Sequence, residues 1–327
     1  MMRGRNGPET CNAHNSESAL PCTTMDNHST HDLHDKRLAD AWATLQAHSD
    51  KGLPLHTDPS RLAFADPEFL LRRETRGLRM QLELMKPDLE MRAHGIENTV
   101  VVFGSARFRS EEESGALIAQ AEAAGDSVAA ERWRRLARSS HYYEKARAFG
   151  KLVAQYSSDK DPEDKLFVCT GGGPGIMQAA NRGAHEGGGL SVGLAIALPM
   201  EEEANPYVTP ALSFKFHYFA IRKMHFMMRA KALVAFPGGF GTLDELFETL
   251  TLVQTGKMPR VPIVLFGRAF WEKLIDFNHL VDCGMISAED LGLFHYVETA
   301  EAAWARLADH YGFDRPATAE SDFPEDD

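Results

Sequence analysis

The sequence predicts an α/β fold: a Rossmann-like, doubly wound parallel sheet flanked by helices, with a helical extension at the N-terminus. Two observations lead to this prediction. Short, continuously apolar segments, which are typical of strands buried on both faces, alternate with longer segments that have helical spacing. Three of the apolar segments run into glycine-bearing turns, at 104–107, 171–175 and 237–242. Strands that alternate with helices favour a parallel sheet, and right-handed crossovers place helices on both of its faces.

The main domain is expected to span residues 98–312. Its predicted strands are 99–104, 166–170, 191–197, 213–216, 232–236, 261–266 and 294–297. Its predicted helices are 111–124, 128–156, 176–186, 218–230, 246–253, 270–281 and 298–311. Because the carboxyl ends of parallel strands meet at one edge of the sheet, the three glycine-bearing turns should converge there on one ligand site.

The segments outside the main domain differ from it in composition. Residues 1–35 are rich in Asn, Ser, Thr and His, and we expect them to be disordered. Their Cys and His residues match no zinc-binding spacing. Residues 36–97 are expected to form the helical extension, and residues 313–327 form an acidic C-terminal tail.

A helix start is predicted inside the extension. Asp66-Pro67 has the pattern of an N-cap followed by proline at the first helical position. The helix, from 68 to 85, would carry four leucines on one side, namely Leu70, Leu71, Leu78 and Leu82. Pro87 is expected to end it, because proline has no N–H to donate within a helix.

Composition limits the class of protein. The chain has 327 residues, 43% of them hydrophobic, which is enough for a full core. Its formal net charge of −12 counts against a nucleic-acid partner. No apolar run approaches the roughly 20 residues of a membrane span, and residues 1–30 lack the apolar segment of a signal peptide. The four cysteines have no framework spacing, so we expect a cytoplasmic chain with reduced thiols and no membrane partner.

The turn at 237–242 is the most informative motif. It follows an apolar run and reads Pro-Gly-Gly-Phe-Gly-Thr. A glycine-rich turn between a strand and a helix presents backbone N–H groups beside the positive end of the helix, which makes an anion site. Thr242 adds a hydroxyl donor, and Glu245 is expected on the first helical turn. The motif therefore predicts a phosphate-bearing ligand with a carboxylate beside it.

Three other polar motifs leave alternatives open. The loop 171–175 departs from the GxGxxG dinucleotide fingerprint, so it fits either a phosphate or close packing of a helix on a strand. Arg222 and Lys223 lie among apolar neighbours, which indicates either half-buried cations with anionic partners or a solvated helix face. In the acidic run 201–203, Glu202 either reaches a ligand hydroxyl or belongs to a solvated charge run.

The histidines and cysteines of the main domain give no catalytic pattern. His185, His217 and His225 form no triad or metal set, and we interpret each as structural. Cys169, at a strand end, is predicted to be a buried small apolar residue.

Taken together, these motifs resemble the LONELY GUY family. Members of this family are phosphoribohydrolases that act on cytokinin riboside 5′-monophosphates, and they were long mislabelled as lysine decarboxylases. The resemblance runs from about residue 100 to about residue 267, and it is densest at 102–107, 171–189 and 217–256. The chain looks like the longer form of the family, with extra helices before the first strand. Residues 1–97 and 298–327 lie outside the resemblance.

The resemblance implies roles for individual residues. Arg222 and Glu245 fall on the family's catalytic pair, and Lys223 falls beside it in the substrate site. The other candidate substrate- and phosphate-binding residues are Gly104, Ser105, Gly172, Gly173, Gly175, Gly238, Gly239, Phe240, Gly241, Thr242, Asp244, Thr251 and Glu202. The compact form has a Met-His pair directly before the Arg-Lys pair, whereas here residues 219–221 read Phe-Ala-Ile, which leaves the preferred base open.

The residues fit cleavage of an N-glycosidic bond. Positive charge develops on the ribose C1′ as that bond breaks. A carboxylate at Glu245 would stabilise this charge, orient the ribose hydroxyls or activate water. The reaction requires no metal or cofactor. Lysine decarboxylation would require pyridoxal phosphate on a lysine, and neither Lys223 nor Lys231 has a supporting motif.

A second hypothesis is a non-catalytic carrier of a nucleotide or of the molybdenum cofactor, since such proteins have similar glycine-rich turns. The presence of both Arg222 and Glu245 favours the enzyme. The apolar helix faces in 68–85, 218–230 and 246–256 exceed what one sheet face must cover, so a homodimer or higher homo-oligomer is also expected.

Overall fold

A computed structural model of the chain describes residues 63–197 and 204–313. The chain divides into two compact units, Met1–Phe69 and Leu70–Asp327. In the described part of the first unit, Asp66 accepts a hydrogen bond from the main-chain N–H of Phe69 at 3.1 Å, as expected for the N-cap of a helix. The predicted disordered segment 1–35, residues 36–62 of the extension, Glu202 and the acidic tail from 314 lie outside the described residues. The predicted domain boundaries remain predictions.

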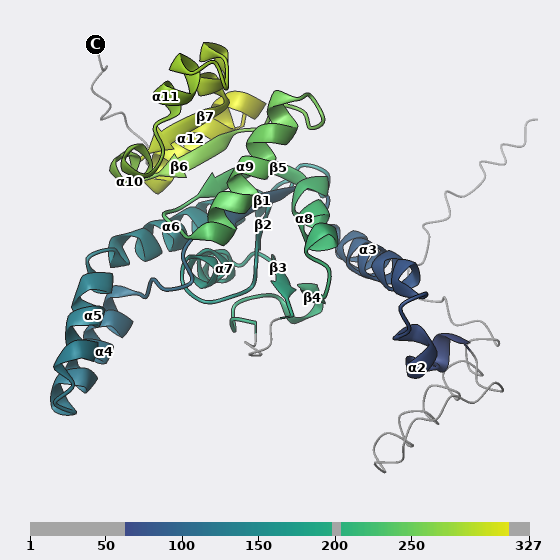
Figure 1. Cartoon of the computed structure of the whole chain (residues 1–327), viewed down its shortest axis with the longest axis horizontal. Helices are drawn as coiled ribbons and strands as arrows, with labels where there is room; N and C mark the ends of the chain where they lie inside the picture. The colour runs from purple at the N-terminus through teal and green to yellow at the C-terminus, as the bar shows by residue number, and fades with distance from the viewer. Residues whose placement is uncertain (1–62, 198–203, 314–327) are drawn as a thin grey trace, which may run out of the picture. The chain divides into compact units, whose positions relative to one another are not determined.

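The second unit contains a seven-stranded, all-parallel sheet in the order β4-β3-β2-β1-β5-β6-β7 (Figure 1). The strands are β1 (Thr99–Phe103), β2 (Phe167–Thr170), β3 (Ser191–Ile196), β4 (Ser213–Phe216), β5 (Ala230–Ala235), β6 (Ile263–Phe266) and β7 (Phe294–Val297). Strands β2, β3 and β4 follow one another outward on one side of β1. The chain then crosses to the other side of β1, where β5, β6 and β7 follow one another outward. This doubly wound order confirms the predicted fold class, and it places the topological switch point between β1 and β5.

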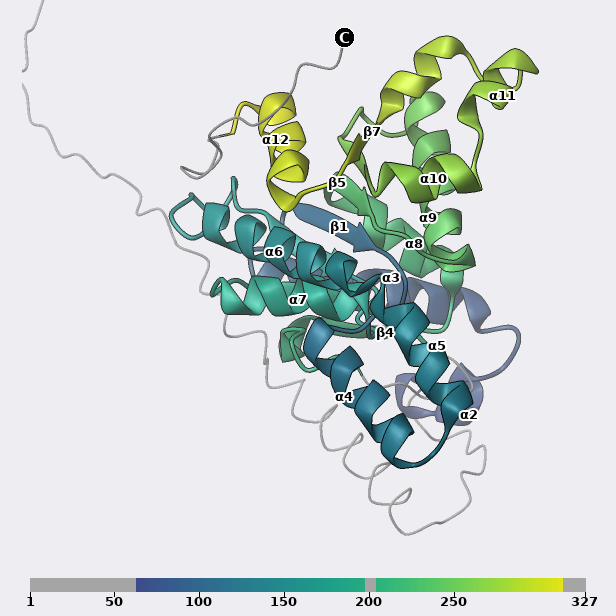
Figure 2. The same ribbon diagram turned by 90° about the vertical axis from the view of Figure 1, so that its left-hand side faces the viewer.

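Helices cover both faces of the sheet, so β1 and its neighbours are buried on both faces. All five residues of β1 are buried, and alternate residues enter two separate apolar clusters. The first cluster also receives Phe226 from α8, Leu246 from α9 and Trp271 from α10. The second receives Phe149 from α6 and Trp304 from α12. Figure 2 shows α6 and α7 on one side of the strands and α8, α9 and α10 on the other.

The helices of the second unit run as follows. They are α3 (Arg76–Ala93), α4 (Glu111–Ala123), α5 (Ser127–Ala137), α6 (Ser140–Ser157), α7 (Ile176–Glu186), α8 (Phe219–Met228), α9 (Phe240–Gln254), α10 (Arg268–Leu274), α11 (Phe277–Asp282) and α12 (Ala300–Tyr311), with α2 (Pro67–Leu70) at the boundary of the first unit. Short 3-10 turns occupy Ala63–Ala65, Pro210–Leu212 and Ala288–Leu293. None of the helices in the described part of the chain has the length and apolar character needed to cross a membrane.

Two helices predicted as continuous are each divided. The predicted helix 128–156 is α5 followed by α6. The chain turns between them because α5 pairs with α4, whereas α6 packs against α7 and the sheet. The predicted helix 270–281 is α10 followed by α11. Asp276 interrupts it by accepting a hydrogen bond from the main-chain N–H of His279 at 2.9 Å, which starts a new helix.

The predicted extension helix 68–85 is also wrong in its limits. The helix that begins at Pro67 has only one turn, and the hydroxyl of Thr75 donates to the carbonyl oxygens of Leu70 and Arg72 in the bend that follows. The next helix, α3, continues through Pro87 to Ala93. Proline cannot donate to the carbonyl four residues before it, and His225 contacts that carbonyl, on Glu83, through Nε2 at 3.1 Å. This outside partner satisfies the group that the proline leaves unpaired.

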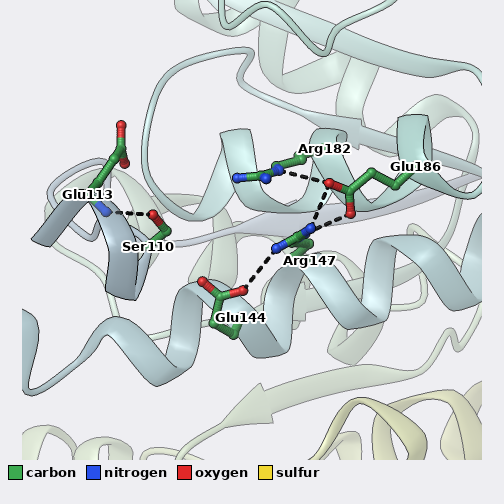
Figure 3. Close-up of polar contacts among 6 residues, drawn as sticks. All are labelled: Ser110, Glu113, Glu144, Arg147, Arg182 and Glu186. Carbon is green, nitrogen blue, oxygen red and sulfur yellow. Dashed lines mark hydrogen bonds and ion pairs between the residues drawn. The ribbon is translucent and has the colours of Figure 1, made fainter. Parts of the chain in front are cut away.

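An ion-pair network joins α6 to α7 (Figure 3). Arg147 on α6 donates two hydrogen bonds to the carboxylate of Glu186 on α7, at 2.7 and 2.8 Å. Arg182 donates to the same carboxylate at 2.9 Å, and Glu144 lies 3.4 Å from Arg147. The helix backbones approach closely, since a Cβ placed on Gly183 would collide with the main-chain carbonyl of Arg147. The charged groups are partly exposed, so we expect each pair to stabilise the fold by about 1 kcal/mol or less.

Candidate active site

A cavity of about 910 Å³ opens at the carboxyl edge of the sheet, beside the switch point between β1 and β5. Its lining comes from the turns after β1 and β5, the end of β3, and helices α5, α7, α8, α9 and α10. The lining residues are Phe103, Gly104, Ser105, Ala106, Arg107, Phe108, Leu136, Met177, Ile196, Phe219, Arg222, Phe270, Leu274 and 237–245. The turns after β1 and β5 therefore converge here, as predicted from the parallel sheet.

Arg222 and Glu245 form a buried ion pair on one side of this cavity. The guanidinium Nη1 of Arg222, on α8, lies 3.1 Å from Oε1 of Glu245, on α9. The two side chains are only 10% and 8% exposed. The Nε of Arg222 also donates to the main-chain carbonyl of Leu194 on β3 at 2.7 Å. The cation is thus held between a carboxylate and a strand carbonyl, which fixes its position.

Burial changes the acidity of both partners. Removal from water raises the pKa of Glu245; the Arg222 guanidinium opposes this rise, and the charge of Asp244 adds to it. Burial lowers the pKa of Arg222, and Glu245 opposes that change. Arginine starts from so high a pKa that it stays protonated. The net result is a carboxyl group with a raised pKa beside a fixed cation, which is an arrangement suited to proton transfer.

The glycine-rich turn leads into the uncapped start of α9. Helix α9 begins at Phe240, with Gly239 as its N-cap, and among the described residues no side chain caps its first N–H groups. By contrast, Ser110, Asp126 and Thr299 cap α4, α5 and α12 in this way. The start of α9 lies in the lining of the cavity. Its N–H groups carry partial positive charge and favour an anion.

Helix α9 starts earlier than predicted, so Glu245 is its sixth residue and lies on the second turn rather than the first. The turn before it is tightly packed. A Cβ placed on Gly238 would collide with the side chain of Thr242, whereas a Cβ on Gly239 would meet no described atom within 4 Å. Gly241 has open space on the side of Glu245, whose Oε2 is 3.9 Å from the position of such a Cβ. The turn therefore leaves room for a ligand above Gly239 and Gly241.

Two more predicted residues, Gly104 and Ser105, line the cavity from the turn after β1. The main-chain N–H of Ser105 donates to the carbonyl of Pro237 at 3.0 Å, which ties this turn to the one after β5. A Cβ on Gly104 would lie 2.7 Å from the side chain of Ile176, so the first residue of α7 needs glycine there. The hydroxyl oxygen of Ser105 accepts from the N–H of Arg107 at 3.1 Å.

Gly172, Gly173 and Gly175 do not line the cavity. The side-chain amide of Asn205 donates to the carbonyl oxygens of Gly172 and Gly173, at 3.1 and 3.0 Å. Gly175 has φ of 72° and packs directly on the main chain of Ser105 and Ala106. The loop thus packs a helix against the turn after β1, which is the structural alternative left open by the sequence. Its neighbour Gly171 leaves space for the guanidinium of Arg222, since a Cβ there would lie 2.9 Å from Nη2.

The remaining predicted residues lie at the margin of the cavity or outside it. Lys223 pairs through Nζ with Asp244 and Glu248, both at 3.1 Å, and Asp244 is part of the lining. The hydroxyl of Thr251 donates to the carbonyl of Phe247 at 2.7 Å, and Thr251 lines a separate, shallower hollow along α9. Glu202 lies outside the described residues.

The sequence reasoning missed the apolar wall of the cavity. This wall includes Phe108, Leu136, Met177, Phe270 and Leu274. Met177 lies two residues after the predicted glycine loop, so its position could have been inferred. Leu136 could not, because it reaches the cavity only through the fold-back of α5 that the long predicted helix concealed.

Of the histidines and cysteines interpreted as structural, His225 and Cys169 are buried. His225 is buried against α3, and burial lowers its pKa. Cys169 is buried, and desolvation raises the pKa of its thiol to about 12. Among residues 63–197 and 204–313, no group of three or more His, Cys, Asp or Glu side chains is placed to hold a metal ion.

Comparison with known proteins connects this site to a family. A family model described as possible lysine decarboxylase matches residues 177–307. The cytokinin riboside 5′-monophosphate phosphoribohydrolase LOG of Oryza sativa subsp. japonica is 27% identical over 155 residues, which cover 47% of this chain and 60% of that protein. LOG3 of Arabidopsis thaliana is 24% identical over 200 residues, which cover 58% of this chain and 88% of that protein. Over this part of its length the chain is similar to members of the LONELY GUY (LOG) family. The resemblance inferred from the motifs is thereby confirmed.

The region matched by the family model begins at Met177 and includes both members of the buried ion pair. Helix α3 precedes this region. Two solved structures of molybdenum cofactor proteins also align with the chain. The carrier protein from Chlamydomonas reinhardtii is 20% identical, with a TM-score of 0.39, covering 65% of this chain and 99% of that one. The binding protein from Rippkaea orientalis is 15% identical, with a TM-score of 0.39, covering 65% and 94%. Likenesses of this size carry no functional conclusion.

Proposed function

We propose that this LOG relative hydrolyses the N-glycosidic bond of a purine riboside 5′-monophosphate, either a cytokinin riboside monophosphate or AMP. The products are the free base and ribose 5-phosphate. One observation carries the proposal: the buried Arg222–Glu245 pair shares a cavity with the uncapped, glycine-rich start of α9. The names of the LOG relatives give the reaction class.

The 5′-phosphate would bind at the start of α9. The N–H groups of this turn and the hydroxyl of Thr242 are suitable donors, and the helix start adds favourable electrostatics. Binding a phosphate that does not react lets the enzyme use that interaction to position the glycosidic bond. We therefore expect a monophosphate to be a substrate and the matching nucleoside not to be one.

Glu245 would act at the ribose. In the balanced reaction the bond from C1′ to the base nitrogen breaks, water oxygen bonds to C1′, and one water proton ends on the base. A carboxylate near C1′ stabilises the positive charge that develops there and can take the proton from water. The guanidinium of Arg222, 3.1 Å away, would hold this carboxylate in place and favour its ionised form.

The apolar wall would receive the base. Phe108, Leu136, Phe270 and Leu274 offer aromatic and aliphatic surface rather than charge. Such a surface suits a purine ring, and it also suits a prenyl group on that ring. The proposal needs no metal or cofactor.

A lysine decarboxylase activity fits the chain poorly. A lysine that holds pyridoxal phosphate must be available as the free amine. The ammonium of Lys223 is paired with Asp244 and Glu248; burial opposes its charge, but these hydrogen bonds prevail and raise its pKa. Lys231 lies at the start of β5, with its ammonium 5.8 Å from the ring centre of Tyr311.

Product analysis by chromatography tests the proposal. The panel contains AMP, GMP, isopentenyladenosine monophosphate and the matching nucleosides. We expect free base and ribose 5-phosphate from monophosphates alone. Glu245→Gln and Arg222→Ala should each lower kcat about a hundredfold or more, while Glu301→Gln on the exposed face of α12 serves as the matched control.

Circular dichroism must show that the variants are folded. Unchanged turnover in folded Glu245→Gln would contradict the proposal. If no nucleotide is hydrolysed and one is retained through gel filtration, the chain is a carrier instead.

We also propose that the chain acts as a homodimer or larger homo-oligomer in the cytoplasm, without a nucleic-acid or membrane partner. Four apolar side chains on α3 are about half exposed in the single chain, Leu78, Leu82, Met85 and Leu89. Phe240, at the mouth of the cavity, is 93% exposed. Apolar surface of this kind supports self-association, because burying it in a second copy removes it from water.

A further inference from the structure

A single residue of α3, Glu83, contacts α8 at two places. Its carboxylate accepts hydrogen bonds from the main-chain N–H groups of His217 and Tyr218, both at 3.0 Å. These two residues directly precede α8, and Tyr218 is its N-cap. The side chain of Tyr218 supplies no cap. The carboxylate of Glu83, which belongs to another helix, therefore takes the place of a side-chain cap.

The second contact uses the main chain of Glu83. Its carbonyl lacks a helical donor because Pro87 follows four residues later, and Nε2 of His225 lies 3.1 Å from that oxygen. His225 is buried on the inner side of α8. The helix is therefore held at its start and again about two turns later by the same residue of α3. Figures 1 and 2 both show α3 beside α8.

These two contacts bracket Arg222 in the sequence of α8. The N–H of Arg222 donates to the carbonyl of Tyr218 at 3.1 Å, which is the first helical hydrogen bond of α8. The N–H of Tyr218 donates to Glu83, and the carbonyl of Tyr218 accepts from Arg222. The residue at the start of the helix is thus hydrogen-bonded through both its donor and its acceptor. Any shift of this start moves the base of the Arg222 side chain relative to Glu245 on α9.

We propose that Glu83 is a positioning residue of the active site, which acts through α8 to hold Arg222 against Glu245. This inference rests on the proposed function for its kinetic consequences. It gives a role in catalysis to α3, a helix that precedes the region matched by the family model. Glu83 itself does not line the cavity.

A carboxylate is needed here for a physical reason. Two N–H groups point to the same side chain, and each requires its own acceptor oxygen. A glutamine would accept from one N–H and present its own NH₂ group to the other. A negative charge at a helix start also interacts favourably with the partial positive charge of that end.

The test compares Glu83→Ala and Glu83→Gln with Glu90→Gln, which removes an exposed carboxylate from the same helix. We expect kcat to fall about ten- to a hundredfold in Glu83→Ala, since small misplacements of catalytic groups cost this much. The glutamine variant should lie between alanine and the wild type. KM should change less than about twofold, because Glu83 does not line the cavity that would bind the substrate. Glu90→Gln should match the wild type.

A second measurement does not depend on activity. Hydrogen exchange of the main-chain amides at 217 and 218 should become faster in Glu83→Ala than in the wild type or Glu90→Gln, because their acceptor is gone. Wild-type kcat in folded Glu83→Ala would overturn the inference while leaving the proposed function standing. A higher KM with unchanged kcat in Glu83→Ala would overturn the inference as well. If the wild type hydrolyses no nucleotide, the proposed function fails, and unchanged exchange at 217 and 218 would then separately overturn the contact on which the inference rests.

Discussion

At the scale of residues, the main feature is a pair of opposite charges removed from water. Arg222 and Glu245 are both buried, and either one alone would be an uncompensated buried charge costing about 3–5 kcal/mol. The pair also has an asymmetry. Arg222 has a further acceptor in the carbonyl of Leu194, whereas Glu245 keeps a second oxygen on the side of the open turn. That second oxygen is the one available to a ligand in the cavity.

The acidity of Glu245 leads to a prediction about pH. Burial is the main cause that raises its pKa, and among the charged groups that act on it Arg222 lowers the pKa while Asp244 raises it. Asp244→Asn removes a negative charge and so lowers that pKa, which keeps the carboxylate ionised to lower pH. If the ionised form is active, the pH below which kcat/KM falls should move downward in this variant.

The measurement is a pH profile of kcat/KM for wild type and Asp244→Asn. Glu248 remains to pair with Lys223 in the variant, so that cation is not left without a partner. Glu301→Gln, on α12 outside the cavity lining, controls for the loss of a carboxylate. If the pH below which kcat/KM falls is higher in Asp244→Asn than in the wild type, the group whose ionisation sets that pH is not Glu245.

At the scale of elements, the strands and the limits of α7 were predictable, whereas the limits of α3, α5, α6, α10 and α11 were not. Continuous apolar runs identify β1, β5 and β6 because both faces of these strands are buried. Helix limits depend on partners that lie far away in the sequence. Pro87 would end an isolated helix, whereas in α3 the helix continues and His225 contacts the carbonyl that the proline leaves unpaired. No local pattern near residue 87 contains that information.

The candidate site divides in the same way. The turn at 237–242 and the carboxylate of Glu245 could be inferred from residue types and their place after a strand, whereas the pairing of Glu245 with Arg222 was implied only by the family resemblance. The role of 171–175 could not, because glycine serves both phosphate binding and close packing. The contact of Gly175 with the main chain of Ser105 and Ala106 shows the close packing, and phosphate binding by this loop stays a prediction.

The close packing of α6 on α7 gives a prediction about stability. Gly183→Ala should lower the free energy of unfolding by about 1–3 kcal/mol, because the new methyl group collides with the main-chain carbonyl of Arg147. Gly115→Ala on α4 is the matched control. A Cβ there meets no atom of the described residues within 4 Å, so alanine should stabilise the helix by about 0.5–1 kcal/mol.

Denaturant unfolding followed by circular dichroism measures both changes. The two substitutions add the same single methyl group to a helical glycine, so any intrinsic preference of alanine for helices is common to both. Equal effects of the same sign would show that α6 and α7 are not in close contact.

At the scale of the whole molecule, exposed apolar side chains on α3 predict self-association. Leu82→Glu with Leu89→Glu should shift the molecular mass measured by light scattering toward that of a single chain, because charge opposes burial of this surface. Val128→Glu, on α5, is the control. Val128 is also exposed and apolar, but it is isolated from the α3 side chains in the sequence.

A single-chain mass for the wild type would contradict the predicted assembly. A wild-type mass in the double variant would show instead that another surface holds the copies together. The molecular mass of Val128→Glu shows what an added surface charge does by itself, so either result can be assigned to the surface on α3.

The contact between Glu83 and His225 joins residues 142 positions apart in the chain. Contacts of such long sequence separation close large loops, and they form late when a chain folds. Helix α8, which carries Arg222, therefore reaches its place against α3 after most helices already exist. Enzymatic activity should return with the slowest phase of refolding, later than the far-ultraviolet signal that reports helix formation.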